Sequence, residues 1–128
     1  MSIEIKISIG ELVDKITILQ IKKEMISDNS KINKVETELN HLLSTLSVVL
    51  EENTALEKLM AELKEVNTKL WKIEDDIRLC EKEKKFDNEF IKLARAVYIT
   101  NDKRFEIKNA INKKFSSEIA EVKSYEKY

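Results

Sequence analysis

Residues 54–80 read TALEKLMAELKEVNTKLWKIEDDIRLC, and the spacing of their apolar side chains decides the fold. The apolar positions alternate between steps of three and four residues, which is the period of an amphipathic helix packed along one seam. They are Leu56, Leu59, Leu63, Val66, Leu70, Ile73, Ile77 and Cys80. A helix of about 30 residues is roughly 45 Å long, so we expect an elongated helical molecule.

The same spacing precedes this stretch, over residues 31–50. The polar link Glu51-Glu52-Asn53 separates the two stretches, and Thr54 to Glu57 has the capping-box form that begins a helix. Two such helices joined by a short polar link predict an antiparallel coiled-coil hairpin over residues 31–84. The apolar positions of its first helix are Ile32, Val35, Leu39, Leu42, Leu46 and Val49.

The N-terminal residues carry a different pattern. Residues 3–9 alternate isoleucine with polar residues, which is the period of a half-buried strand. Because a lone strand is not stable, we expect it to pair with residues 118–125 as a minimal two-stranded ribbon. Ser8 to Glu11 has the capping-box form and predicts a helix that runs to Ile26. The wide apolar stripe of this helix predicts contacts with more than one neighbouring helix.

One further helix is predicted in the C-terminal part of the chain. Lys82 to Phe86 is a charged link, and Asp87 or Asn88 can cap the helix that follows. Thr100-Asn101-Asp102 interrupts the apolar stripe of this helix. No glycine or proline breaks the chain there, so we expect one continuous helix. The short link allows this helix to fold back along the preceding one.

The composition agrees with an all-α fold in a single domain over residues 1–128. The chain has no proline and one glycine, and it is 37% charged and 42% hydrophobic, as expected of amphipathic helices. The net charge is −1 and the signs alternate, which argues against a nucleic-acid partner. No apolar run approaches the length of a bilayer span, and the N-terminus lacks an apolar signal segment. We therefore expect a cytoplasmic protein with no membrane partner.

The C-terminal half carries the candidate site. Only three of the 23 basic residues are arginines, all between positions 78 and 104, and every aromatic residue lies beyond position 70. An arginine indicates a place where a planar fork of donors is needed. Helical spacing gathers the polar residues into one stripe on each of the last two helices, and the two stripes can meet as a seam. The candidate ligand-binding residues are Trp71, Glu74, Arg78, Arg95, Tyr98, Asn101, Asp102 and Arg104.

Two interpretations of this seam remain open. One is an ionic network that fixes the register of two helices, and the other is a pocket for an anionic ligand or a metal. We predict no catalytic residue, no metal ligand and no cofactor. Cys80 occupies an apolar heptad position, which is typical of a small buried side chain, and we expect His41 at the surface. The carboxylates also lack the spacing of helical NTP pyrophosphohydrolases, and the motif order differs from that of helical chorismate mutases.

Five stretches carry a further signal, namely Ile7–Leu19, Trp71–Arg78, Phe90–Tyr98, Asn101–Arg104 and Lys123–Tyr125. Together they resemble a family of small bacterial helical proteins of unknown function. The resemblance spans most of the chain and is weakest over residues 27–68. It implies no activity and no catalytic residue, and it associates the family with surface-polysaccharide or glycosyl-transfer pathways.

These patterns favour a non-enzymatic interaction or assembly module that pairs with another copy of itself or with a protein partner. Its contact surface is expected on apolar side chains that one hairpin leaves uncovered, namely the stripe of the first helix together with Leu43 and Leu50. The alternative is a domain, enzymatic or not, that binds a small anionic ligand or a metal at the polar seam.

Overall fold

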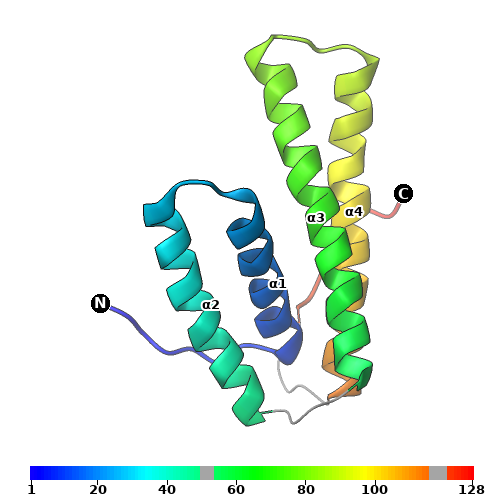
Figure 1. The fold of residues 1–128 in the computed structure, drawn as a ribbon. Helices are drawn as coiled ribbons and strands as arrows, with labels where there is room; N and C mark the ends of the chain where they lie inside the picture. The colour runs from blue at the N-terminus through cyan, green and yellow to red at the C-terminus, as the bar shows by residue number, and fades with distance from the viewer. Residues whose placement is uncertain (50–53, 116–120) are drawn as a thin grey trace.

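Four helices build the molecule (Figure 1). The computed structural model describes residues 1–49, 54–115 and 121–128, and no strand occurs in these three stretches. The prediction of an all-α helical bundle is therefore confirmed. None of the helices in the described stretches combines the length and the apolar composition needed to cross a membrane. The helices are α1 (Ile9–Met25), α2 (Asn29–Val49), α3 (Thr54–Lys82) and α4 (Asn88–Lys114).

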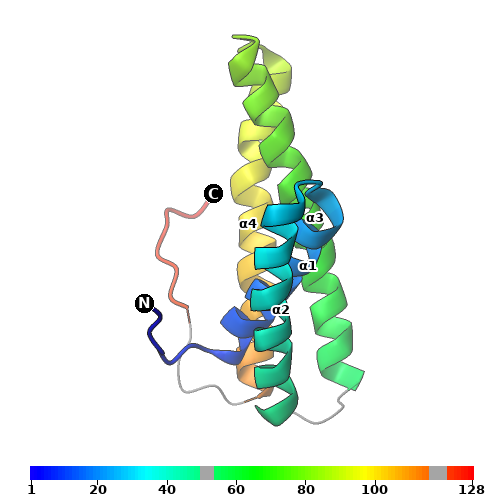
Figure 2. The same cartoon turned by 60° about the vertical axis from the view of Figure 1, so that its left-hand side comes forward.

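α1 is the central helix of the fold. It packs against α2, α3 and α4, and Figures 1 and 2 show α2 on one side of it and the α3–α4 hairpin on the other. Each buried aliphatic side chain contributes roughly 1.5–3 kcal/mol relative to an exposed one. Because three helices pack against α1, its wide apolar stripe contacts several neighbours, as expected. Its buried apolar residues are Leu12, Val13, Ile16, Leu19 and Ile21.

The helices pair differently from the expected hairpin. The residues of α2 and α3 were expected to pack against each other, but α2 packs against α1, and α3 packs against α1 and α4. One apolar cluster around α1 includes the seam residues of both helices. They are Val35 and Leu39 of α2 and Leu56 and Leu63 of α3. A heptad stripe shows that a helix is buried along one face, but it does not choose between two equally apolar partners. Residues 50–53 of the expected hairpin lie outside the described residues.

The expected ribbon of the two termini does not form within the part of the chain that the structure describes. Residues 1–8 and 121–125 contain no strand, and residues 118–120 of the expected partner lie outside the described stretches. Ile3 and Ile5 are 81% and 73% exposed, so their side chains bury little surface. Without burial, alternation alone does not stabilise a two-stranded ribbon.

The helix ends follow local sequence signals closely. The Ser8 hydroxyl accepts a hydrogen bond from the Glu11 amide at 3.0 Å, and the Asp87 carboxylate caps α4 by accepting from the Glu89 and Phe90 amides. α4 continues through residues 100–102, as predicted. α3 ends with hydrogen bonds from the Lys85 amide to the Cys80 carbonyl and from the Lys84 amide to the Glu81 carbonyl. This is a Schellman motif, and its residue with positive φ is Lys84, at 55°.

Candidate functional site

A buried carboxylate, that of Asp14, lies where α1 meets α3 and α4. The Asp14 residue is 0% exposed. The Arg104 guanidinium of α4 donates to both of its oxygens, through Nε to Oδ1 at 2.9 Å and through Nη2 to Oδ2. The Asn67 amide of α3 donates to Asp14 Oδ1 at 2.9 Å and to the Thr17 hydroxyl at 3.0 Å. One carboxylate thus ties three helices together.

Lys108 extends this group of charges toward the C-terminus. Its ammonium is nearly buried and lies 2.8 Å from a Glu11 oxygen, 2.8 Å from a Glu121 oxygen and 3.9 Å from an Asp14 oxygen. Burial lowers the pKa of Lys108, but the bonds to both glutamates and the charge of Asp14 outweigh burial, so the pKa lies above its ordinary value. The hydrogen bonds with Asp14 also raise the pKa of Arg104. Both cations therefore stay charged.

The single glycine of the chain lies beside this cluster. The Gly10 amide donates to Asn112 Oδ1 at 2.7 Å, and a Cβ atom at Gly10 would lie only 2.5 Å from the Lys108 carbonyl oxygen. Because that oxygen belongs to the backbone of α4, it cannot turn away. Glycine is therefore what permits α1 to approach α4 closely enough for the ion pairs to form.

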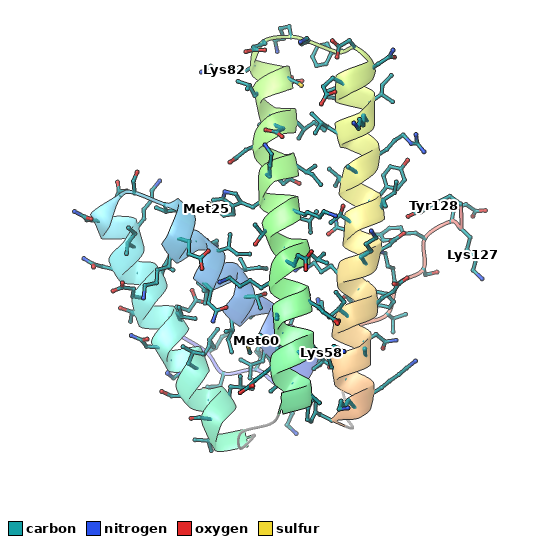
Figure 3. All side chains as sticks on the ribbon, turned by 45° about the vertical axis from the view of Figure 1, so that its right-hand side comes forward. Met25, Lys58, Met60, Lys82, Lys127 and Tyr128 are labelled. Atoms are coloured by element: carbon teal, nitrogen blue, oxygen red, sulfur yellow. The ribbon has the colours of Figure 1, made fainter. Side chains whose placement is uncertain are left out.

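The C-terminal segment, residues 121–128, lies along α4, with Tyr128 beside that helix in Figure 3. The Asp102 carboxylate accepts hydrogen bonds from the Lys123 ammonium and the Tyr128 hydroxyl. The Tyr128 ring also meets the Tyr98 ring edge to face, with centroids 5.4 Å apart. The bonds from Lys123 and Tyr128 lower the pKa of Asp102, and the bond to Asp102 raises the pKa of Tyr128 to about 12.

Two hollows adjoin the Asp14 cluster. The first, which we call the groove, has a volume of about 500 Å³ and lies between α1, α3 and α4. The second, which we call the tail cavity, has a volume of about 220 Å³ and lies between α4 and the C-terminal segment. Arg104 and Asn101 line both. The groove is also lined by Ile18, Ile21, Asn67, Leu70, Trp71, Glu74, Asp75 and Arg78, and the tail cavity by Phe105, Lys108, Glu121, Lys123 and Tyr125.

The structure separates the eight candidate residues into three groups. Five of them, Trp71, Glu74, Arg78, Asn101 and Arg104, line the groove. Tyr98 and Asp102 instead contact the C-terminal segment. Arg95 is exposed on α4, and no carboxylate among the described residues pairs with it. Glu74 and Arg78 pair with each other along α3, so this ion pair lies within one helix and does not join α3 to α4.

Sequence reasoning missed the residues at the centre of the cluster. Gly10, Asp14 and Thr17 follow one another at steps of four and three residues on α1, which places them on one face. An aspartate within such an apolar helix indicates a buried and paired charge, because an unpaired one would be too costly. Asn67, four residues after the buried Leu63, gives a similar but weaker signal. Nothing in the pattern around Glu121 points to its contact with Lys108.

The α3–α4 hairpin extends beyond α1 and α2 at the end where α3 connects to α4, and residues 76–99 form this outer part (Figure 1). We call it the arm. Cys80 is its only buried residue, which agrees with the prediction for that side chain. The rings of Phe86 and Phe90 meet edge to face at its end, with centroids 5.2 Å apart. Large apolar side chains are exposed along the arm: Leu79, Phe86, Ile91, Tyr98 and Ile99.

Residues that could carry metal or thiol chemistry are scattered. Within the described stretches, no three His, Cys, Asp or Glu side chains come together as a metal site. His41 is exposed on α2, as predicted, and Cys80 is buried between α3 and α4. Neither lines the groove or the tail cavity.

Comparison with known proteins agrees with the resemblance noted in the sequence. A family model described as "Family of unknown function (DUF6165)" matches residues 1–128. No curated protein and no solved structure matches the chain. The family match covers every residue of the sequence, so the chain belongs to this family of unknown function.

Proposed function

We propose that the protein is a non-enzymatic assembly module and that its arm pairs with the arm of a second copy. The observation that carries this proposal is the open apolar seam of the arm. Over residues 76–99 two helices lie together, yet Cys80 alone is buried. Elsewhere α1 and its neighbours bury a continuous core, so the arm is the part of the fold that lacks cover.

The exposed side chains of the arm are large. Leu79, Phe86 and Ile91 are 52%, 55% and 53% exposed. Several large exposed apolar side chains in one part of a fold favour an interaction site, whereas a single exposed leucine does not. The apolar stripe of α1, where the sequence placed the contact surface, is covered by three helices. Leu43 is only 37% exposed, and Leu50 lies outside the described residues.

A second arm supplies the missing cover. Two helical hairpins that pack side by side form a four-helix bundle, and a two-fold axis lets each arm offer the same surface to the other. The arm's charges permit this approach, because six basic and five acidic residues leave a net charge of +1. They are Arg78, Lys82, Lys84, Lys85, Lys92 and Arg95 against Asp76, Glu81, Glu83, Asp87 and Glu89.

Light scattering coupled to size exclusion tests the proposal. We expect the mass of a dimer, and we expect Leu79→Ser and Ile91→Ser to shift it toward the monomer because each removes apolar contact from the arm. Val48→Ser is the matched control, since Val48 is 87% exposed on α2, away from the arm. A wild-type protein that stays monomeric at high concentration would contradict the proposal, as would an equal effect of all three substitutions.

A second candidate function is the binding of a small ligand in the groove. Its support is the convergence of five predicted residues on a hollow of about 500 Å³, within the roughly 300–1,000 Å³ typical of ligand pockets. Ile18, Ile21, Leu70 and Trp71 give it an apolar wall, and Arg104 gives it a fixed cation. A thermal-shift panel of nucleotides, nucleotide sugars and divalent metals tests this function. A uniform lack of response, together with unchanged Trp71 fluorescence, would count against it.

A further inference from the structure

The tail cavity has the features of a second site, independent of the arm. We propose that it binds a small carboxylate ligand and that Glu121 is the chain's own carboxylate, seated on the cation that such a ligand would use. The charges of the cavity lining, the exposure of Glu121 and the size of the cavity favour such a ligand.

Three cations line the tail cavity, namely Arg104, Lys108 and Lys123. Among the described lining residues, Glu121 is the one carboxylate. Arg104 is held in place by Asp14 through two of its donors, and an arginine has five, so donors remain for a ligand. A planar guanidinium fixed in this way is suited to a carboxylate, because it needs no reordering on binding.

Glu121 is the most easily displaced of the carboxylates that surround Lys108. The side chain of Asp14 is 1% exposed and that of Glu11 is 34% exposed, whereas that of Glu121 is 47% exposed. Asp14 and Glu11 belong to the central helix, but Glu121 lies on the C-terminal segment. A carboxylate that arrives from solvent can therefore replace Glu121 without disturbing the contact between α1 and α4.

The C-terminal segment is attached mainly through charged and hydrogen-bonded side chains. Val122, Tyr125 and Tyr128 are strongly exposed, so little apolar burial holds this segment on α4. Its polar contacts with the helices are the pair of Glu121 with Lys108 and the bonds of Lys123 and Tyr128 to Asp102, and the Tyr128 ring adds one edge-to-face contact with Tyr98. Glu121 is the exposed member of its pair, at 47% against 6% for Lys108, so a carboxylate from solvent can reach Lys108 from the side that Glu121 covers.

The size of the cavity restricts the ligand to a short carboxylate. Its volume of about 220 Å³ lies below the roughly 300–1,000 Å³ of pockets for larger organic ligands. The Phe105 and Tyr125 side chains lie among the charged groups and offer apolar contact to a short carbon chain. A mono- or dicarboxylic acid of a few carbon atoms meets both conditions.

Isothermal titration calorimetry with acetate and with succinate, at constant ionic strength, tests the proposal. In the wild-type protein only those molecules in which Glu121 is not paired with Lys108 can bind the ligand. The apparent Kd should therefore be higher than the Kd of the open site. Glu121→Gln removes this internal competitor, so we expect its Kd for succinate to be about tenfold lower than that of the wild type. Glu126→Gln is the matched control, since Glu126 is an exposed carboxylate of the same segment that does not line the cavity.

A second variant tests the cation that the segment itself supplies. In the Glu121→Gln background, where the internal competitor is already absent, Lys123→Gln removes one of the three lining charges, and we expect it to weaken succinate binding several-fold without changing the mass of the protein in solution. Equal tightening in Glu121→Gln and Glu126→Gln would show a general charge effect and overturn the proposal. Absence of binding in Glu121→Gln would overturn it as well. Neither result depends on the pairing of the arms, which mass measurements follow separately.

Discussion

Gly10 shows at the scale of one residue how closely α1 and α4 approach. Alanine in an open helix is about 1 kcal/mol more favourable than glycine, so Gly10→Ala would stabilise the protein if space were free. Here the added Cβ atom would lie 2.5 Å from the Lys108 carbonyl oxygen and 2.8 Å from Asn112 Oδ1. We therefore expect a loss of about 1–3 kcal/mol in the free energy of unfolding, measured with urea. A gain in stability would show that the two helices are farther apart.

Asp14 is the residue on which the buried charges depend. Asp14→Asn keeps the shape of the side chain but removes the charge that faces Arg104 and Lys108. Breaking a buried ion pair from one side costs about 3–5 kcal/mol, and we expect a loss near the lower end because Arg104 keeps partial contact with solvent. Asp76→Asn is the control, because Asp76 pairs with Lys72 at the surface and should contribute at most about 1 kcal/mol. Chemical denaturation of both variants gives the comparison.

Single residues also show which parts of the candidate site the sequence could indicate and which it could not. Arg104 was expected in the site because arginine is rare in the chain, and it does lie at the meeting point of both hollows. Its partner Asp14 was not predicted, because Asp14 lies within an apolar stripe whose spacing predicts packing and no ion pair. The contact joins residues 90 positions apart in the sequence. Spacing along a helix predicts which residues share a face, but it carries no information on contacts at that separation.

The C-terminal segment is an element whose attachment depends on pH. The pKa of Asp102 lies below its usual 3.8, so its contribution is complete above that value and disappears as the pH falls through the lowered pKa. The pKa of Tyr128 rises from 10.0 to about 12, so its contribution is complete below pH 10 and disappears as the pH rises through about 12. We expect NMR contacts between the Tyr98 and Tyr128 rings from about pH 4 to pH 10. Asp102→Asn should abolish the acid transition, and an acid transition that is unchanged in Asp102→Asn would contradict the assignment.

The C-terminal end of α3 carries a residue that is not the most stable one for its backbone conformation. Lys84 occupies the left-handed position of the Schellman motif with φ 55°, where glycine is usual. The left-handed conformation costs a residue with a side chain roughly 1–2 kcal/mol, and a glycine avoids this cost. Part of the advantage is lost because glycine gives up more conformational entropy when the chain folds. Lys84→Gly should therefore raise the free energy of unfolding by about 0.5–1 kcal/mol. Lys82→Gly, inside the last turn of α3, should lower it by about 1 kcal/mol, and thermal denaturation distinguishes the two.

At the scale of elements, the helices themselves were predictable but their partners were not. Caps at Ser8 and Asp87 and unbroken apolar spacing marked where helices begin and continue. The pairing of α2 and α3 was expected because both carry narrow heptad stripes. The structure instead places α1 between α2 and the α3–α4 hairpin, since its stripe is wide enough to cover three neighbours. The central helix of this fold is the one with the widest apolar stripe, and the helices with the most regular heptad spacing lie on either side of it.

The whole molecule divides into a well-packed part around α1 and the open arm. Buried apolar residues from all four helices form the core cluster, but the arm contributes none to it. The arm's seam lies between only two helices, and Cys80 is the one residue that they bury within residues 76–99. The molecule therefore has a buried apolar core near α1, whereas the arm leaves large apolar side chains exposed.

Pairing of two arms through these exposed side chains makes the thermal stability depend on protein concentration. A dimer that unfolds to two separate chains gains stability by mass action as concentration rises. For a chain of this size we expect Tm to rise by roughly 2–3 °C for each tenfold increase in concentration. Ile91→Ser should remove this dependence, because it takes an exposed apolar side chain from the arm, while Val48→Ser on α2 should preserve it. A wild-type Tm that is constant over a hundredfold range of concentration would show that the arm does not pair with a second copy.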